Sequence, residues 1–158
     1  MSKDILLYES GNGGEWLILN NDVSLVENLF QQAYICLFGG NIEASTRGNE
    51  LPSEIRQDYW ANSLLFSQRK EKQFNSETER IINETPLNSS GRIAIERAVQ
   101  EDLKFMKNIA DISINVIILS SSKLMIEIRL RQPDSKEDKI LQILWENSKV
   151  EVILEKTI

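Results

Sequence analysis

The chain has 158 residues, of which 41% are hydrophobic and 27% are charged, the composition of a soluble globular protein that can bury one core of its own. Its net charge of −6 and its pI near 4.8 argue against a nucleic-acid-binding protein or a protein that docks on anionic membranes, because both need a basic face. The sequence contains no histidine, so the commonest metal ligand and the commonest general base at neutral pH are both missing.

Cysteine usage and hydropathy indicate the compartment. Cys36 is the single cysteine, which fits a reducing environment, and its apolar neighbours predict a small buried hydrophobic side chain. No apolar run approaches the roughly 20 residues of a membrane span. The first residues, Met1–Asp4, lack the apolar core of a signal peptide. We therefore expect a protein that stays in the cytoplasm where it is made.

Two short apolar runs, Ile5–Tyr8 and Trp16–Leu19, are separated by the glycine-rich segment Glu9–Glu15. This order predicts a β-hairpin with a flexible tip. A phosphate-binding loop is the functional alternative for such glycines. It would require a following Lys-Ser/Thr pair and a helix, and neither is present.

The first predicted helix spans Asp22–Phe38. Ser24 and Glu27 have the spacing of a capping box at its start, and Gly39-Gly40 is typical of a helix end. The apolar residues recur every three or four positions and predict one buried stripe: Leu25, Val26, Leu29, Phe30, Ala33 and Leu37.

A long segment without periodicity, residues 41–62, follows this helix and ends with Tyr59 and Trp60. A loop of this length is unusual in a compact domain unless it binds something. Tyr and Trp are enriched among interface anchors, so Tyr59 and Trp60 are candidate contacts with a protein partner. The equally weighted alternative is that Trp60 folds back as a lid over the core.

Two further helices are predicted before the C-terminal strands. Ser76 and Glu79 form a second capping box for a short helix through Ile82, which Pro86 closes. A longer amphipathic helix starts at Asn88. Its apolar positions fall on one face and predict a buried stripe, which comprises Ile95, Ala98, Val99, Leu103, Met106 and Ile109.

The pattern then changes to the period of two that is typical of β-strands. Four strands are predicted, over residues 112–118, 124–130, Lys139–Trp145 and Val150–Leu154. The helical stripe just before them is the natural cover for one face of their sheet. The sequence therefore predicts a single α+β domain, residues 1–158, with an N-terminal hairpin, helices and a C-terminal antiparallel sheet packed against the long helix.

The sequence shows no arrangement that indicates catalysis. Histidine-dependent triads are excluded, and Glu96, Glu101 and Asp102 resemble ordinary solvated helix residues. Asp134, Glu137 and Asp138 lack the glycine turn and the ligand spacing of a calcium loop. We therefore predict no catalytic residue, no cofactor and no metal.

An exposed strand edge is the better candidate for function. The last predicted strand is short and apolar, and an open edge can accept a strand from another chain. Its residues, and hence the predicted protein interface, are Val150, Glu151, Val152, Ile153 and Leu154. The alternative is an edge blunted by the charges of Glu151, Glu155 and Lys156.

The order of these elements resembles the baseplate assembly proteins of Mu-like contractile phages, which are relatives of the wedge protein that initiates the tail sheath. The resemblance rests on Asp4–Leu7 with the glycine turn, on Val26–Leu29, on Arg56–Asn62 as the polar-aromatic loop, and on Glu101–Phe105 leading into the strands. Some wedge relatives carry an acid-Pro-Arg turn in this region, and this chain does not.

The resemblance implies a non-enzymatic virion protein of the tail baseplate, present in a ring of six. Its C-terminal sheet would nucleate the tail sheath by strand addition. The tail sheath protein and the larger wedge proteins would be its partners, with the tail tube or hub proteins as further candidates. Phage tails, tail-like bacteriocins and other injection machines share this architecture. A small cytoplasmic adaptor or chaperone for a soluble client is the alternative, and a carboxylate hydrolase is a more distant one.

Overall fold

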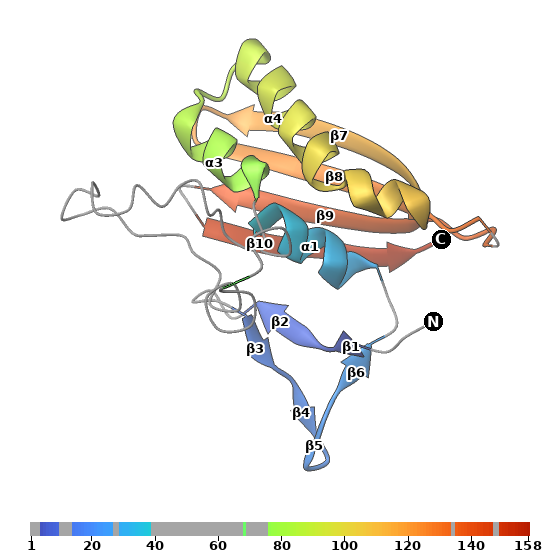
Figure 1. Cartoon of the computed structure of the whole chain (residues 1–158). Coiled ribbons are helices and arrows are strands. Elements are labelled where there is room, and N and C mark those ends of the chain that lie inside the picture. The colour runs from blue at the N-terminus through green and yellow to red at the C-terminus, as the bar shows by residue number, and fades with distance from the viewer. Residues whose placement is uncertain are drawn as a thin grey trace.

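A four-stranded antiparallel sheet near the C-terminus carries helices on one of its faces (Figure 1). The computed structural model describes residues 4–9, 14–26, 29–38, 68, 76–133, 135–146 and 149–158. Three helices, α1, α3 and α4, lie over the same face of the sheet, and a triangle of short strands lies beside α1. The predicted α+β fold class is confirmed.

The sheet consists of β7 (Asp111–Ser120), β8 (Lys123–Arg131), β9 (Lys139–Glu146) and β10 (Lys149–Thr157) in the order β10-β9-β8-β7. From β8 onward each strand pairs antiparallel with the strand before it, the pairing that short connections between consecutive strands favour. The period of two in β8 buries Leu124, Ile126, Ile128 and Leu130 completely. All four predicted strands are confirmed, although β10 extends three residues beyond Leu154.

The long helix is confirmed as α4 (Ser89–Asp102), with the Asn88 side chain accepting the N–H of Gly91 at 2.9 Å. Five residues of the predicted stripe are buried, namely Ile95, Ala98, Val99, Leu103 and Met106. The prediction that the sixth residue, Ile109, is buried was wrong, because its side chain is 42% exposed. The α-helix ends at Asp102 and continues as the 3₁₀ turn η2 (Lys104–Asn108), and three residues per turn rotate Ile109 off the stripe.

The short helix α3 (Glu77–Glu84) begins as predicted. The Ser76 hydroxyl accepts the backbone N–H of Glu79 at 3.2 Å, and Thr85, just before Pro86, ends the helix in an extended conformation. Serine at this position stabilises the helix by satisfying a backbone donor that has no partner within the helix.

The first helix is shorter than predicted. It begins at Phe30, as α1 (Phe30–Phe38). Asp22–Val23 and Leu25–Val26 instead form the strands β5 and β6, so a capping box at Ser24 was wrong. The backbone of Ser24 donates to Leu17 at 2.9 Å and accepts from Leu6 at 2.8 Å. These contacts with distant residues override the local signal, and they leave Leu25 57% exposed rather than buried. The later stripe residues are buried as predicted: Leu29, Phe30, Ala33 and Leu37.

The predicted N-terminal hairpin is present as β2 (Leu7–Glu9) paired with β3 (Gly14–Trp16). Two more ladders adjoin it, β1 (Asp4–Ile5) with β6 and β4 (Ile18–Leu19) with β5. Each ladder forms one corner of the triangle in Figure 1. Its three sides are joined by a cycle of backbone hydrogen bonds from Leu6 to Ser24, from Ser24 to Leu17 and from Leu17 to Leu6.

A tight turn at one corner of the triangle and a hydrogen bond to α1 determine its shape and its attachment. Asn20 and Asn21 both have positive φ, 51° and 65°, the conformation that a two-residue type I′ turn requires and that asparagine tolerates. The Gln31 side chain of α1 donates to the carbonyl of Ile5 at 2.7 Å. The triangle is therefore joined to the helical layer by a side chain of α1.

Candidate functional site: the edge of the C-terminal sheet

The strand β10, which contains the predicted interface residues, lies at one border of the sheet (Figure 1). Among the residues that the structure describes, β10 pairs with β9 and with no strand on its outer side. We call the backbone groups of β10 that point away from β9 the β10 edge. Unpaired N–H and C=O groups of this kind can bind a strand of another chain.

The alternation of hydrogen-bonded and non-hydrogen-bonded pairs between β9 and β10 identifies the residues of the β10 edge. Asp138 and Ile158 exchange two backbone hydrogen bonds, each of 2.8 Å. Paired residues in an antiparallel ladder alternate between hydrogen-bonded and non-hydrogen-bonded pairs. Thr157 opposite Lys139 and Glu155 opposite Leu141 are therefore the non-hydrogen-bonded pairs. The N–H and C=O groups of Thr157 and Glu155 point away from β9.

A bulge divides this edge. The register between β10 and β9 shifts between Val152 and Leu154, so Ile153 is the extra residue, and its side chain is 44% exposed. A bulge interrupts a regular ladder and bends the strand. A partner strand can therefore pair without interruption along residues 154–157, whereas the sequence pattern emphasised Val150–Leu154.

The structure describes the side chains of some predicted interface residues, only the backbone of others, and neither for Tyr59 and Trp60. Val150 packs against the hydrophobic core. For Glu151, Val152 and Leu154 the structure describes the strand backbone. Tyr59 and Trp60 lie outside the described residues, so their contact with a partner stays a prediction.

An ion pair lies at the end of the sheet where β10 finishes. The Arg131 guanidinium donates to the Asp138 carboxylate at 2.6 Å, and this hydrogen bond lowers the pKa of Asp138 and raises the pKa of Arg131. Asp138 is the residue whose backbone pairs with Ile158. The pair thus connects the end of β8 to the start of β9, opposite the last residues of β10.

A second polar cluster lies where the three helices meet. Asp102, at the end of α4, accepts the backbone N–H groups of Glu77 at 3.0 Å and Thr78 at 2.8 Å. The buried Ser76 hydroxyl donates to the carbonyl of Leu37 in α1. Burial raises the pKa of Asp102, and hydrogen bonds from Thr78 and Glu77 oppose that effect. We call Ser76, Thr78 and Asp102 the helix junction.

The helix junction shows why sequence reasoning overlooked Asp102. An aspartate at a helix C-terminus carries no local signal, because it is unfavourable for its own helix dipole. Its role is to cap the N-terminus of α3, 24 to 25 residues earlier in the chain. Only the packing of α3 against α4 brings the two ends together.

Replacing Ser76 with alanine tests the helix junction. The change removes the acceptor for the Glu79 N–H and the donor to the Leu37 carbonyl. We expect the free energy of unfolding to fall by about 0.5–2 kcal/mol, measured by urea denaturation. Ser89→Ala, at an exposed position in the first turn of α4, is the control and should change stability by less than about 0.5 kcal/mol. Equal effects of both variants would contradict a capping role for Ser76.

Cys36 lies close to the helix junction and has little capacity for thiol chemistry. Its side chain is partly buried against the hydrophobic core. Burial, with a further contribution from the charge of Asp102, raises the pKa of the thiol to about 12. The reactive thiolate is therefore scarce at neutral pH.

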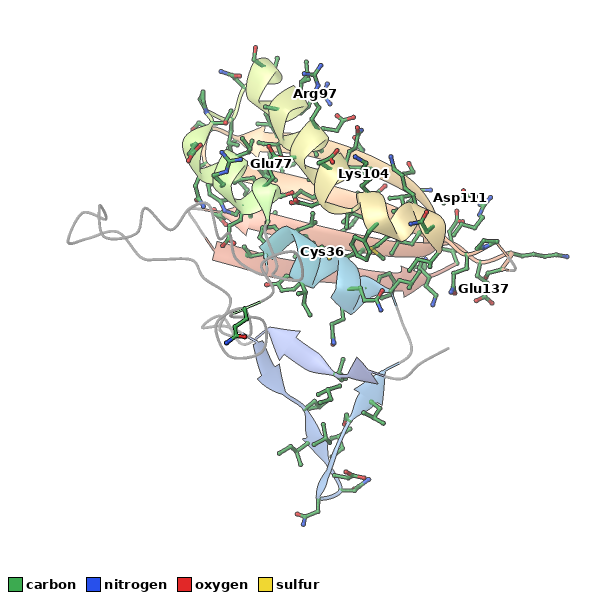
Figure 2. All side chains as sticks on the ribbon, in the orientation of Figure 1. Cys36, Glu77, Arg97, Lys104, Asp111 and Glu137 are labelled. Atoms are coloured by element: carbon green, nitrogen blue, oxygen red, sulfur yellow. The ribbon has the colours of Figure 1, made fainter. Side chains whose placement is uncertain are left out.

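An open cavity of about 580 Å³ lies between α3 and α4, with Ile81, Ala94 and Ala98 among its lining residues. Figure 2 shows three of its charged residues, Glu77, Arg97 and Lys104, on the helices around it. Three of its charged residues form ion pairs with residues nearby in the sequence, Glu77 with Arg80 at 3.5 Å and Lys104 with Glu101 at 2.9 Å. The cavity therefore carries both signs of charge and does not select one class of ligand.

The three carboxylates that were candidates for catalysis, Glu96, Glu101 and Asp102, have different partners in the structure and do not form one site. Glu96 pairs with Arg92 at 2.7 Å and Glu101 pairs with Lys104, while Asp102 caps α3. Within the described ranges, no group of three or more His, Cys, Asp or Glu residues could hold a metal ion. None of the helices in this part of the chain is long and apolar enough to cross a membrane.

Comparison of the chain with protein-family models, with curated proteins and with solved structures gave no match.

Proposed function

We propose that this chain is a structural assembly protein that accepts a strand from a partner along the β10 edge, and that it does so in the baseplate of a contractile tail, where the tail sheath protein supplies the strand. The observation that carries the proposal is the position of β10 at the border of the sheet, with the backbone of Glu155 and Thr157 pointing outward. Main-chain hydrogen bonds supply the affinity in strand addition.

The rest of the sheet gives this edge a rigid support. The strand β9, next to it, has Leu141 and Ile143 fully buried under the helical layer. The Arg131–Asp138 pair and the Asp138–Ile158 hydrogen bonds fix the end of β10. A preorganised edge loses less conformational entropy on binding than a flexible one, which favours affinity.

The setting comes from the sequence resemblance to baseplate assembly proteins of Mu-like phages. Under this proposal six copies form a ring, the β10 edges nucleate the first sheath ring, and Tyr59 and Trp60 contact a larger wedge protein. Two of the carboxylates considered for catalysis, Glu96 and Glu101, form ion pairs on the surface of α4, which favours an assembly role over a catalytic one.

The proposal is tested by a proline at the edge. Proline has no N–H, so Glu155→Pro removes a donor that points toward the partner while leaving the hydrogen-bonded pairs with β9 in place. Glu155→Ala is the matched control, because it removes the same side chain and keeps the N–H. After co-expression with the cognate sheath subunit, we expect the alanine variant to capture sheath protein like the wild type and the proline variant to lose capture.

Thermal melting shows whether Glu155→Pro keeps the fold. A folded proline variant that captures sheath protein as well as the alanine variant would contradict strand addition at the β10 edge. If the proline variant melts far below the wild type, Thr157→Pro serves instead, since its N–H points in the same direction and lies near the end of the strand.

A further inference from the structure

The opposite border of the sheet, β7, is less protected than β10. Among the described residues β7 pairs with β8 alone. Soluble proteins usually protect such borders with charges, prolines or bulges. The strand β10 has four charged residues and a bulge in its middle, whereas β7 carries one charge, Asp111, at its first residue, and the bulge of β7, between Ile118 and Ser120, lies next to the turn into β8. Its register with β8 is regular from Asp111 to Ile118.

The side chains of β7 divide cleanly between two faces. Its even-numbered residues from Ile112 to Ile118 lie opposite Leu130, Ile128, Ile126 and Leu124 of β8, which are all buried under the helices. Ser113 and Asn115 are exposed on the other face. Although they face the core, Ile112 and Ile114 are only partly buried, as expected for side chains at an uncovered border.

We propose that β7 pairs antiparallel with β7 of a second copy of this chain, with Asn115 opposite Asn115 of the other copy. In this register the core-facing residues meet residues of their own kind, Ile112 with Ile118 and Ile114 with Val116. Each β7 keeps its apolar face on the side of the helices, because the twofold axis is perpendicular to the sheet. The two four-stranded sheets join into one of eight strands.

Charge favours a second copy as the occupant. Self-association of a protein with net charge −6 normally brings like charges together, and like charges directly opposite each other in a ladder are unfavourable. The regular part of β7 that pairs in this register, residues 112–118, contains no charged residue, so no two charged residues of the paired strands face each other. A twofold pairing also closes with two copies and leaves both β10 edges free. The inference therefore does not depend on the proposed function.

A charge exchange at Asn115 tests the pairing and its register. Sedimentation equilibrium of the full chain should give a dimer that dissociates on dilution. Asn115→Lys or Asn115→Asp places two like charges opposite each other, and each should raise the dimer dissociation constant by about fivefold. An equimolar mixture of the two variants places lysine opposite aspartate and should restore dimers at the wild-type dissociation constant.

Ile153→Lys adds the same charge to the exposed bulge of β10 and is the matched control, for which we expect wild-type dimerisation. Three results would overturn the pairing. These are a wild-type chain that stays monomeric at every concentration, an Asn115→Lys variant that dimerises like the wild type, or a mixture that associates no better than either variant alone.

Discussion

Replacement of Gly91 with alanine is expected to lower the free energy of unfolding by about 1–3 kcal/mol. Gly91 is buried in the first turn of α4, where a Cβ atom would collide with the backbone carbonyl of Pro86 and lie 3.0 Å from Thr85 Cγ2. That carbonyl accepts the N–H of Asn88 at 2.8 Å, so it is held in place. A loss of stability would be informative, because replacing glycine with alanine in a helix normally raises the free energy of unfolding by about 1 kcal/mol.

The neighbouring position supplies the control for this prediction. Ser90 is exposed in the same turn, and Ser90→Ala should leave the stability unchanged within about 0.5 kcal/mol. Urea denaturation of both variants checks the expectation. If Gly91→Ala were as stable as Ser90→Ala, the close approach of the Thr85–Pro86 segment to α4 would be wrong.

Replacement of Asp102 with alanine should destabilise the protein by about 1–3 kcal/mol. The change leaves the N–H groups of Glu77 and Thr78 without their side-chain acceptor at the start of α3. Asp102→Asn retains one acceptor oxygen and should therefore cost less than alanine. Denaturation at neutral pH measures both effects, and an asparagine variant less stable than the alanine variant would contradict the capping role.

The pH dependence of the asparagine variant follows from the raised pKa of Asp102. Burial makes this carboxyl harder to ionise in the folded protein than in the unfolded chain, whose pKa is near 3.8. The contribution of Asp102 to stability is therefore fully present below pH 3.8 and is lost as the pH rises through the folded pKa. Asparagine has no such titration. The stability of Asp102→Asn relative to the wild type should therefore improve as the pH rises above 3.8.

The C-terminal half of the fold could be predicted from the sequence because its signals are local and agree with one another. The stripe from Ile95 to Met106 and the alternation in β8 each specify one buried face, and the Ser76 capping box marks the start of α3. Short connections between consecutive strands then favour antiparallel neighbours and leave little choice of topology.

The N-terminal part could not be predicted in the same way, because contacts distant in sequence decide it. Ser24 has a capping-box spacing, yet its backbone bonds to Leu6 and Leu17 place it in the strand triangle. The cap that Asp102 provides for α3 likewise depends on a contact between residues far apart in the sequence. The identity of β10 as a border strand required the sheet order, and the bulge at Ile153 moved the usable edge toward residues 154–157.

Hydrogen–deuterium exchange tests most directly whether the β10 edge accepts a strand. In the isolated protein the amides of Glu155 and Thr157 should exchange quickly, while that of Lys156, in a hydrogen-bonded pair with Ile140, should be protected. If the proposed partner, the sheath subunit, adds a strand here, protection should appear at Glu155 and Thr157 when it binds. Binding that leaves these two amides exchanging as quickly as before would contradict the account.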